Sequence, residues 1–150
     1  MPIRERVQQR RFKSPAAEAL VSVVVAAEHF TQQADGLCAR HGITGDQMNV
    51  LRILRGVHPE GHPRYEVARR LMGRSPDVTR LLDRLERQGL VQRERSGDDG
   101  RVSVARITKA GLKLLATIDP ELNELMQSVT RPLSQADLRQ LARLCDALVP

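Results

Sequence analysis

Apolar residues in the segment from Ser75 to Gly89 recur at the spacing of an α-helix and fall on one side of it. The repeat follows the i, i+3, i+4, i+7 pattern and consists of Val78, Leu81, Leu82 and Leu85. Ser75 is a candidate N-cap, Pro76 suits the first helical position, and Gly89 is expected to end the helix. The segment therefore predicts an amphipathic helix that buries one face against the rest of the chain.

The opposite side of this helix is cationic. Its charged residues are Arg80, Arg84 and Arg87, with Asp77 beside them. One interpretation is a face that meets an anionic partner such as DNA. The alternative is an ordinary solvated face, with ion pairs from Asp83 to Arg80 or Arg87.

A short helix over residues 64–72 and a break at Gly73 precede the cationic helix, which is the layout of a helix-turn-helix. In that motif the second helix enters the major groove with its N-terminal end leading. The residues of this helix expected to meet DNA are Ser75, Asp77, Thr79, Arg80 and Arg84. Arg80 and Arg84 carry the planar guanidinium that pairs with guanine edges or phosphates.

A β-hairpin is predicted directly after this helix, over residues 90–107. Two β-capable runs flank the turn sequence Ser96-Gly97-Asp98-Asp99-Gly100. The hairpin carries the basic residues Arg93, Arg95, Arg101 and Arg106. We expect Arg95 and Arg101 to reach DNA, since a cationic β-ribbon can enter the minor groove. Asp99 is a poor phosphate contact and is expected to orient Arg101.

The remaining segments predict a mostly α fold. Aromatic residues make up 2% of the chain and there is no Trp, so the core must be built from Leu, Val, Ile and Ala, as is typical of helical packing. A long helix is expected over residues 15–40 and another from Thr44, which has a capping box with Gln47. The helix from Thr108 is expected to kink or break at Pro120. A last helix follows Ser134, and residues 1–14 predict a mobile basic arm.

The chain carries a formal net charge of +6 and has no N-terminal pattern of a signal peptide. Its longest apolar stretch, residues 19–27, is too short to span a bilayer. The two cysteines, Cys38 and Cys145, make no disulfide framework. These observations predict a cytoplasmic protein.

Catalytic motifs do not occur in the sequence: there is no G-x-S-x-G, no H-E-x-x-H and no phosphate-binding glycine loop. An enzyme is therefore not expected. A winged helix that serves only as a protein-interaction module is a further alternative. It would need an apolar, arginine-poor outer face on residues 75–88, and the observed face is the opposite.

Cysteine and histidine residues suggest two other kinds of site. Cys38 lies near Arg40 and His41, which could stabilise a reactive thiolate, so one interpretation is a redox-sensing regulator that uses Cys38. The other interpretation is that Cys38 is a small buried apolar residue. Cys38-x-x-His41 and His58-x-x-x-His62 superficially resemble zinc-ligand spacing. One cysteine with three histidines is an unusual ligand set, so neither a metal nor any other cofactor is expected.

The stretch from Gly73 to Leu115 resembles the MarR family of bacterial transcription regulators. The family pattern is a T-R…L…G-L-V run, a D-x-R wing tip and L-T-x-x-G. The matching residues are Ser75, the run Val78 to Leu85, Gly89 to Val91, Asp99 to Arg101 and Ile107 to Gly111. Ile107 replaces the usual leucine, and Asp98-Asp99-Gly100 departs from the bulkier or more basic tips of many relatives.

The resemblance implies a homodimer whose N- and C-terminal helices, residues 1–41 and 112–150, interlock around winged-helix regions at 42–111. It implies recognition helices in successive major grooves of a pseudo-palindromic operator, with wing arginines in the flanking minor grooves. Thr79, Arg80, Arg84, Asp99 and Arg101 carry over by position. It also implies a transcriptional regulator, expected to be a repressor. A small phenolic or aromatic effector is expected to modulate it from a cleft between the two regions.

Overall fold

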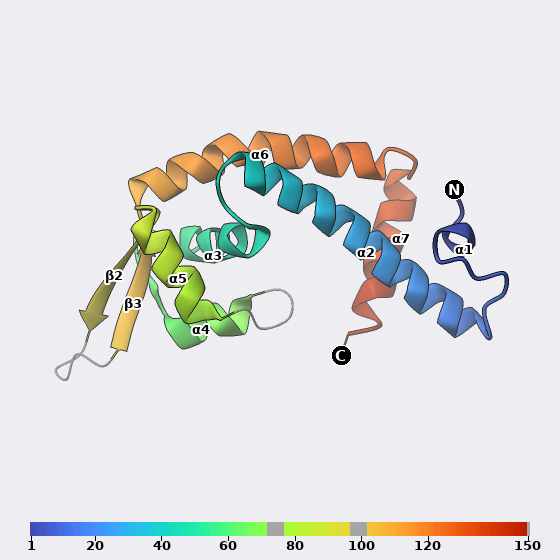
Figure 1. Cartoon of the computed structure of the whole chain (residues 1–150), viewed down its shortest axis with the longest axis horizontal. Helices are drawn as coiled ribbons and strands as arrows, with labels where there is room; N and C mark the ends of the chain where they lie inside the picture. The colour runs from blue at the N-terminus through green and yellow to red at the C-terminus, as the bar shows by residue number, and fades with distance from the viewer. Residues whose placement is uncertain (72–76, 97–101, 150) are drawn as a thin grey trace.

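The computed structural model describes residues 1–71, 77–96 and 102–149. It is mostly helical and carries a small antiparallel sheet (Figure 1). The helices are α1 Ile3–Arg6, α2 Pro15–Arg40, α3 Gly45–Arg55, α4 Arg64–Arg70, α5 Val78–Arg87, α6 Lys109–Thr130 and α7 Gln135–Asp146, and the strands are β1 His62–Pro63, β2 Val91–Ser96 and β3 Val102–Ile107.

The chain forms a lobe and an arm. Helices α3, α4 and α5 and the sheet make the lobe, and α2 and α6 pack against each other and extend away from it (Figure 1). Helices α1 and α7 lie toward the end of the arm that is farther from the hairpin. The predicted fold class, a winged helix-turn-helix with long terminal helices, is confirmed.

Helix starts follow the caps that the sequence predicts. The Ser14 hydroxyl accepts a hydrogen bond from the Ala17 N–H, and Thr44 forms a complete capping box with Gln47. Thr108 and Ser134 cap α6 and α7 in the same way. These short-range bonds satisfy N–H groups that have no partner within the helix, so the helix boundaries are set locally.

The start of α5 differs from the prediction. The helix begins at Val78, and the Asp77 carboxylate accepts the Arg80 N–H at 3.1 Å as its N-cap. A carboxylate at a helix N-terminus also interacts favourably with the helix dipole, which explains the preference for Asp77. The predicted cap, Ser75, and Pro76 lie outside the described residues.

Pro120 does not break α6, so of the predicted kink or break the break is wrong. The helix is continuous from Lys109 to Thr130 and arches over the lobe (Figure 1). Proline removes only one backbone bond, and Ile118 and Leu122 on either side of it are buried. Packing on both sides of the proline therefore holds the helix together.

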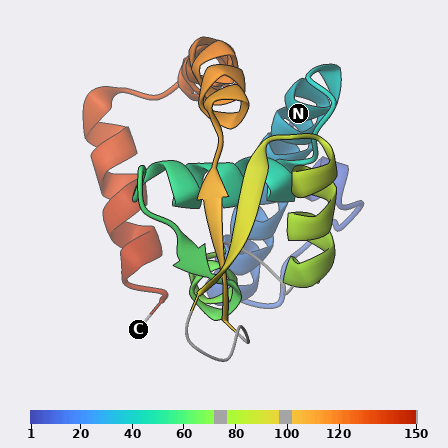
Figure 2. The same ribbon diagram turned by 90° about the vertical axis from the view of Figure 1, so that its left-hand side faces the viewer.

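The sheet contains a third strand that the sequence analysis did not predict. Strand β3 lies between β2 and the two-residue β1 (Figure 2). His62 pairs with Ala105 and Pro63 with Val104. Such a short segment containing proline has no alternating pattern to reveal it. Gly61 allows the close approach, because a Cβ there would lie 2.2 Å from the Ala105 carbonyl oxygen.

The hydrophobic core lies in the lobe and where the lobe meets α6. Its completely buried large side chains include Leu51, Leu54, Leu82, Leu85, Leu115 and Ile118. Two polar contacts reinforce this junction: Arg55 of α3 forms an ion pair with Asp119 at 2.6 Å, and the His41 ring nitrogen lies 3.0 Å from a Glu121 carboxylate oxygen. The apolar face predicted for residues 75–88 is part of this core, and none of the buried core residues is aromatic.

The end of the arm that is farther from the hairpin buries few side chains within the chain. All residues of α7 are described, and none of them is buried. In α2 the buried residues are Ala34, Leu37 and Cys38, all in its C-terminal half. Apolar side chains on these helices, and one just beyond the end of α7, are exposed: Leu20, Val23, Val24, Leu141, Leu144 and, after the helix, Leu148.

Residues 1–14 are not a simple tail. They include α1, and the Arg4 guanidinium donates to both carboxylate oxygens of Glu18 at 2.9 and 3.0 Å. The predicted basic arm is thus attached to the start of α2. In the described residues, no helix is both long and apolar enough to cross a membrane.

Candidate nucleic-acid interface

Helix α5 separates its apolar and cationic residues as the sequence predicts. Its inner face is buried through Val78, Leu81, Leu82 and Leu85. Thr79, Arg80, Arg84 and Arg87 are all exposed on the other side. The buried face fixes the helix to the lobe, and the exposed face presents guanidinium groups to a ligand outside the chain.

The arginines of α5 are available for such a ligand. Among the described residues, neither Arg80, Arg84 nor Arg87 forms an ion pair. The pairs from Asp83 to Arg80 or Arg87, which the alternative interpretation required, are not formed. Asp83 instead binds Arg93 of strand β2. The cationic face therefore keeps its positive charge.

Arg93 is an ion-pair partner of α5, although the sequence analysis assigned it to a cationic ribbon. Its Nη2 donates to Asp83 at 2.5 Å and to Glu86 at 3.1 Å, and its Nε donates to Glu86 at 3.3 Å. The hydrogen bond from Arg93 lowers the pKa of Glu86. These bonds tie the hairpin to α5 and engage both carboxylates with one guanidinium.

The hairpin that follows α5 is confirmed. Strands β2 and β3 pair in register from Val91 with Ile107 to Ser96 with Val102. Arg95 is exposed on β2, and Arg106 donates to Glu94 across the strands. The tip residues Asp99 and Arg101 lie outside the described residues, so their expected roles at DNA remain predictions.

Asp77 has a structural role that the sequence analysis did not assign to it. Its carboxylate is engaged with the first turn of α5, as described above. It stays exposed, beside Thr79 and Arg80. The expected DNA contacts Thr79, Arg80 and Arg84 thus share one helix face, whereas Ser75 lies outside the described residues.

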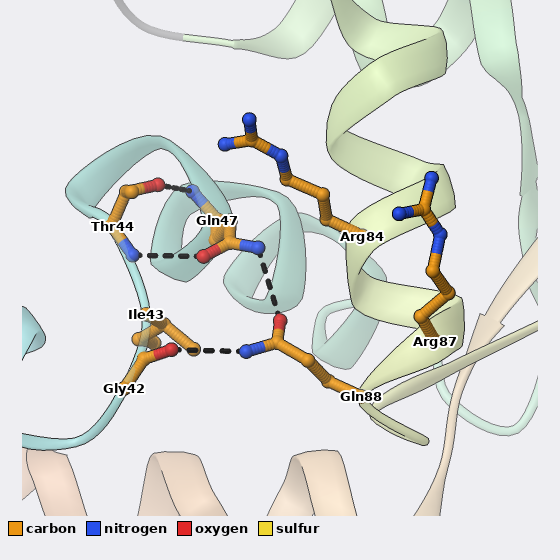
Figure 3. Close-up of a pocket in the computed structure, with 7 residues that line it drawn as sticks. All are labelled: Gly42, Ile43, Thr44, Gln47, Arg84, Arg87 and Gln88. Carbon is orange, nitrogen blue, oxygen red and sulfur yellow. Dashed lines mark hydrogen bonds between the residues drawn. The ribbon is translucent and has the colours of Figure 1, made fainter.

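The C-terminal end of α5 is held by amide contacts that the sequence analysis missed. Gln47 Nε2 donates to Gln88 Oε1 at 3.1 Å, and Gln88 Nε2 donates to the Gly42 carbonyl at 2.9 Å (Figure 3). A pocket of about 440 Å³ lies here, with Arg84 and Arg87 on its rim. The capping box revealed Gln47, but no local pattern identifies a partner 41 residues away.

Cys38 does not fit the redox alternative. Its side chain is completely buried, and its Sγ lies 3.5 Å from the Met48 sulfur. Burial, reinforced by the nearby Asp35 carboxylate, raises the pKa of the Cys38 thiol. A reactive cysteine needs a stabilised thiolate and access to an oxidant, and Cys38 has neither. It is a buried apolar residue of α2, packed against Met48 of α3.

His41, considered above with Cys38 as a possible ligand pair, instead faces Glu121 of α6. This contact is the main cause that lowers the pKa of Glu121, and Arg40 adds to it. In the described part of the chain, no three His, Cys, Asp or Glu side chains are grouped as metal ligands. His58 is exposed, and His62 is part of β1.

A cavity of about 430 Å³ lies between α2, α3 and α6. This volume falls in the range of small-molecule sites, about 300–1,000 Å³. Its lining residues include the apolar Phe30, Met48, Leu122 and Met126 and the charged Asp35, Asp46 and Arg52. It therefore lies at the junction of arm and lobe, where the resemblance implied a cleft.

The comparison with protein families matches residues 41–102 to a model described as the MarR family. A crystal structure of a MarR transcription factor from Planctomyces limnophilus is 34% identical. That similarity covers 91% of this chain and 99% of the other, with a TM-score of 0.72. The family model spans α3 to β2 and ends at the first residue of β3, so it contains Arg80, Arg84 and Arg87 of α5.

Two further relatives are a protein bound to DNA and an operon repressor. The S. aureus MepR–DNA complex is 26% identical, with a TM-score of 0.72, and the similarity covers 92% of this chain and 98% of that one. The homoprotocatechuate degradative operon repressor of Escherichia coli is 26% identical over 110 residues, which are 73% of each chain. Both similarities extend beyond the lobe into the long helices.

Proposed function

The chain belongs to the MarR family of transcriptional regulators, and from this premise we propose that it is a homodimeric repressor that reads a pseudo-palindromic operator. The observation that carries the proposal is the cationic face of α5, because Arg80, Arg84 and Arg87 are exposed and form no ion pair within the described residues. Guanidinium groups in this position suit both guanine edges and phosphates.

In the proposed complex α5 lies in the major groove and the hairpin follows the backbone into the minor groove. Thr79, Arg80 and Arg84 contact the major groove, with Ser75 and Asp77 at the leading end. Arg95 and Arg101 contact the backbone or the minor groove, and Asp99 orients Arg101. The MepR complex supports this arrangement, since a relative of similar fold is bound to DNA.

Dimerisation through residues 1–41 and 112–150 would explain the exposed apolar side chains of α2 and α7. Leu141 is 49% exposed and Leu144 is 48% exposed, on a helix that buries none of its described residues. An amphipathic helix needs a partner for its apolar face, and a second copy of the chain supplies one. Two recognition helices then face successive grooves of one operator.

The cavity between α2, α3 and α6 is the proposed site for a phenolic or other aromatic effector. Phe30, Met48 and Met126 would pack against the ring. Arg52 would bind an acidic group of the effector. A ligand held between arm and lobe favours one spacing of the recognition helices over another, which shifts the population of DNA-competent dimers. The repressor acts in the cytoplasm, where its operator lies.

The central experiment measures binding to the DNA flanking the protein's own gene, by fluorescence anisotropy across a salt series. We expect saturable binding at nanomolar protein with a steep salt dependence. Arg84→Ala should weaken specific binding by about 1–3 kcal/mol if the side chain reads a base. Lys113→Ala removes a positive charge from α6 and serves as the matched control.

Weak binding that does not depend on DNA sequence would show that the flanking DNA does not contain the operator. Equal binding by Arg84→Ala and wild type would contradict the proposal that Arg84 of α5 contacts DNA. A panel of phenolic acids, including salicylate and 3,4-dihydroxyphenylacetate, tests the effector. An active compound should release DNA from wild type but act poorly on Arg52→Ala. If Arg52→Ala responds like wild type, Arg52 does not bind the acidic group.

A further inference from the structure

Gln47 and Gln88 join two parts of the chain whose relative position matters for the proposed function. Gln47 stands in the first turn of α3, and Gln88 is the residue that ends α5. Their amide groups form a chain of hydrogen bonds from the Thr44 N–H through Gln47 and Gln88 to the Gly42 carbonyl (Figure 3). We refer to these bonds as the amide bridge.

Gln47 is an unusual residue for such a place. It is 4% exposed and is the one polar side chain that is buried in the described part of the chain. Its Oε1 accepts from the Thr44 N–H at 2.9 Å, and its Nε2 donates to Gln88. A buried amide with both ends bonded allows one arrangement of its neighbours, because hydrogen bonds are directional.

The location of the amide bridge connects the cavity to the recognition helix. Residues 42–44 form the joint between α2 of the arm and α3 of the lobe. Gly45, Asp46 and Met48, in the same turn of α3 as Gln47, line the cavity between α2, α3 and α6. A displacement of this turn therefore moves the support on which the end of α5 rests.

We propose that Gln47 and Gln88 are positioning residues that set the orientation of α5 relative to the arm and transmit changes at the cavity to it. The inference rests on the proposed function, since it concerns how the dimer matches the spacing of two half-sites. Neither residue needs to touch DNA. Both act through α5, whose arginines do.

The proposal predicts a particular loss when the bridge is cut. With the bridge cut, each protomer must order its α5 against the arm when the dimer binds both half-sites. An ordering cost equal to the net contribution of one hydrogen bond, about 1 kcal/mol, corresponds to about fivefold in affinity per protomer. Two protomers bind one operator, so the dimer should lose about 25-fold. A half-site binds one recognition helix alone and does not require correct spacing, so its affinity should fall much less.

The experiment compares Gln88→Met and Gln88→Glu with wild type. Methionine keeps the length of the side chain and removes both bonds, whereas glutamate keeps the acceptor for Gln47 and removes the donor to Gly42. Gln92→Met is the matched control, because Gln92 is an exposed glutamine that makes no side-chain hydrogen bond in the described residues. Affinity is measured for the operator, for a single half-site, and for operators with one base pair added or removed between half-sites.

We expect both Gln88 variants to lose affinity for the native spacing and to discriminate less between spacings, while Gln92→Met behaves like wild type. A uniform loss on every DNA, or a lower melting temperature with unchanged spacing preference, overturns the positioning role. The circular-dichroism melting curve separates these outcomes from simple unfolding.

A second measurement does not depend on DNA. Spin labels at Thr79→Cys, in a Cys145→Ser background, report the distance between the recognition helices of a dimer. Gln88→Met should broaden the distance distribution, and an unchanged distribution would overturn the proposal. If wild-type protein binds no operator, the proposed function fails, yet the spin-label distances still decide whether the amide bridge positions α5.

Discussion

Replacing Arg93 with alanine removes the ion pairs that hold the hairpin against α5. Arg93 is 24% exposed, and it donates to Asp83 and Glu86 over 2.5–3.3 Å. Two unit charges 3 Å apart attract by about 1.4 kcal/mol in water and about 5 kcal/mol at an effective dielectric constant of 20. Because both carboxylates are more than one-third exposed, solvent screening and side-chain entropy reduce the net gain to about 0.5–1 kcal/mol per pair.

The expected destabilisation is therefore about 1–2 kcal/mol for the two pairs together. In a chain of 150 residues this corresponds to a decrease of about 3–6 °C in melting temperature. Calorimetry at one fixed protein concentration measures it, since dimerisation makes the melting temperature depend on concentration. A double-mutant cycle with Asp83→Ala isolates the coupling between the two residues.

DNA binding by Arg93→Ala distinguishes an ion-pair role from a phosphate contact. Removing a phosphate contact reduces the slope of log affinity against log salt by about 1. We expect Arg84→Ala or Arg95→Ala to reduce that slope if they touch phosphates, and Arg93→Ala to leave it unchanged. A coupling energy of zero with Asp83, or a reduced slope for Arg93→Ala, would refute the assignment.

Four further predictions concern other parts of the chain. Cys38 should react with iodoacetamide much more slowly than Cys145 at neutral pH, because Cys38 is buried and its pKa is raised; equal rates by mass spectrometry would argue against this. Gly61→Ala should lower the melting temperature, because its Cβ would lie 2.2 Å from the Ala105 carbonyl oxygen, a backbone atom that cannot turn away. Truncation after Arg131 should yield a monomer on a calibrated sizing column. A truncated protein that still dimerises would show that the interface does not depend on the residues after Arg131. The lowered pKa of Glu86 means that its ion pair stabilises the fold above about pH 4.5 and is lost as the pH falls through the lowered value, so Arg93→Ala should cost less stability near pH 3 than at pH 7.

Several features of this protein are determined by short stretches of sequence. The helix caps at Ser14, Thr44, Thr108 and Ser134 are contacts across three residues, and their side chains alone specify them. The buried and cationic sides of α5 follow from helical periodicity in the same direct way. The order of helices, the hairpin and the family resemblance therefore required no tertiary information.

Competition between neighbouring signals limited the local predictions. Both Ser75 and Asp77 can cap a helix, and the structure shows Asp77 in that role. Pro120 is a helix breaker by itself, but the burial of Ile118 and Leu122 supports the helix through it. The choice of cap depends on cap geometry and the continuity of α6 depends on packing, and neither can be read from the sequence pattern.

Only the tertiary structure decided which charged and polar groups are paired and which are left for a ligand. Arg93 and Arg84 look alike in the sequence, yet Arg93 is bound to Asp83 while Arg84 has no ion-pair partner in the described residues. His41 meets Glu121 80 residues away, and Gln47 meets Gln88 41 residues away. The physical reason is that ion pairs and hydrogen bonds act over a few ångströms, so their partners are fixed only when the chain has folded.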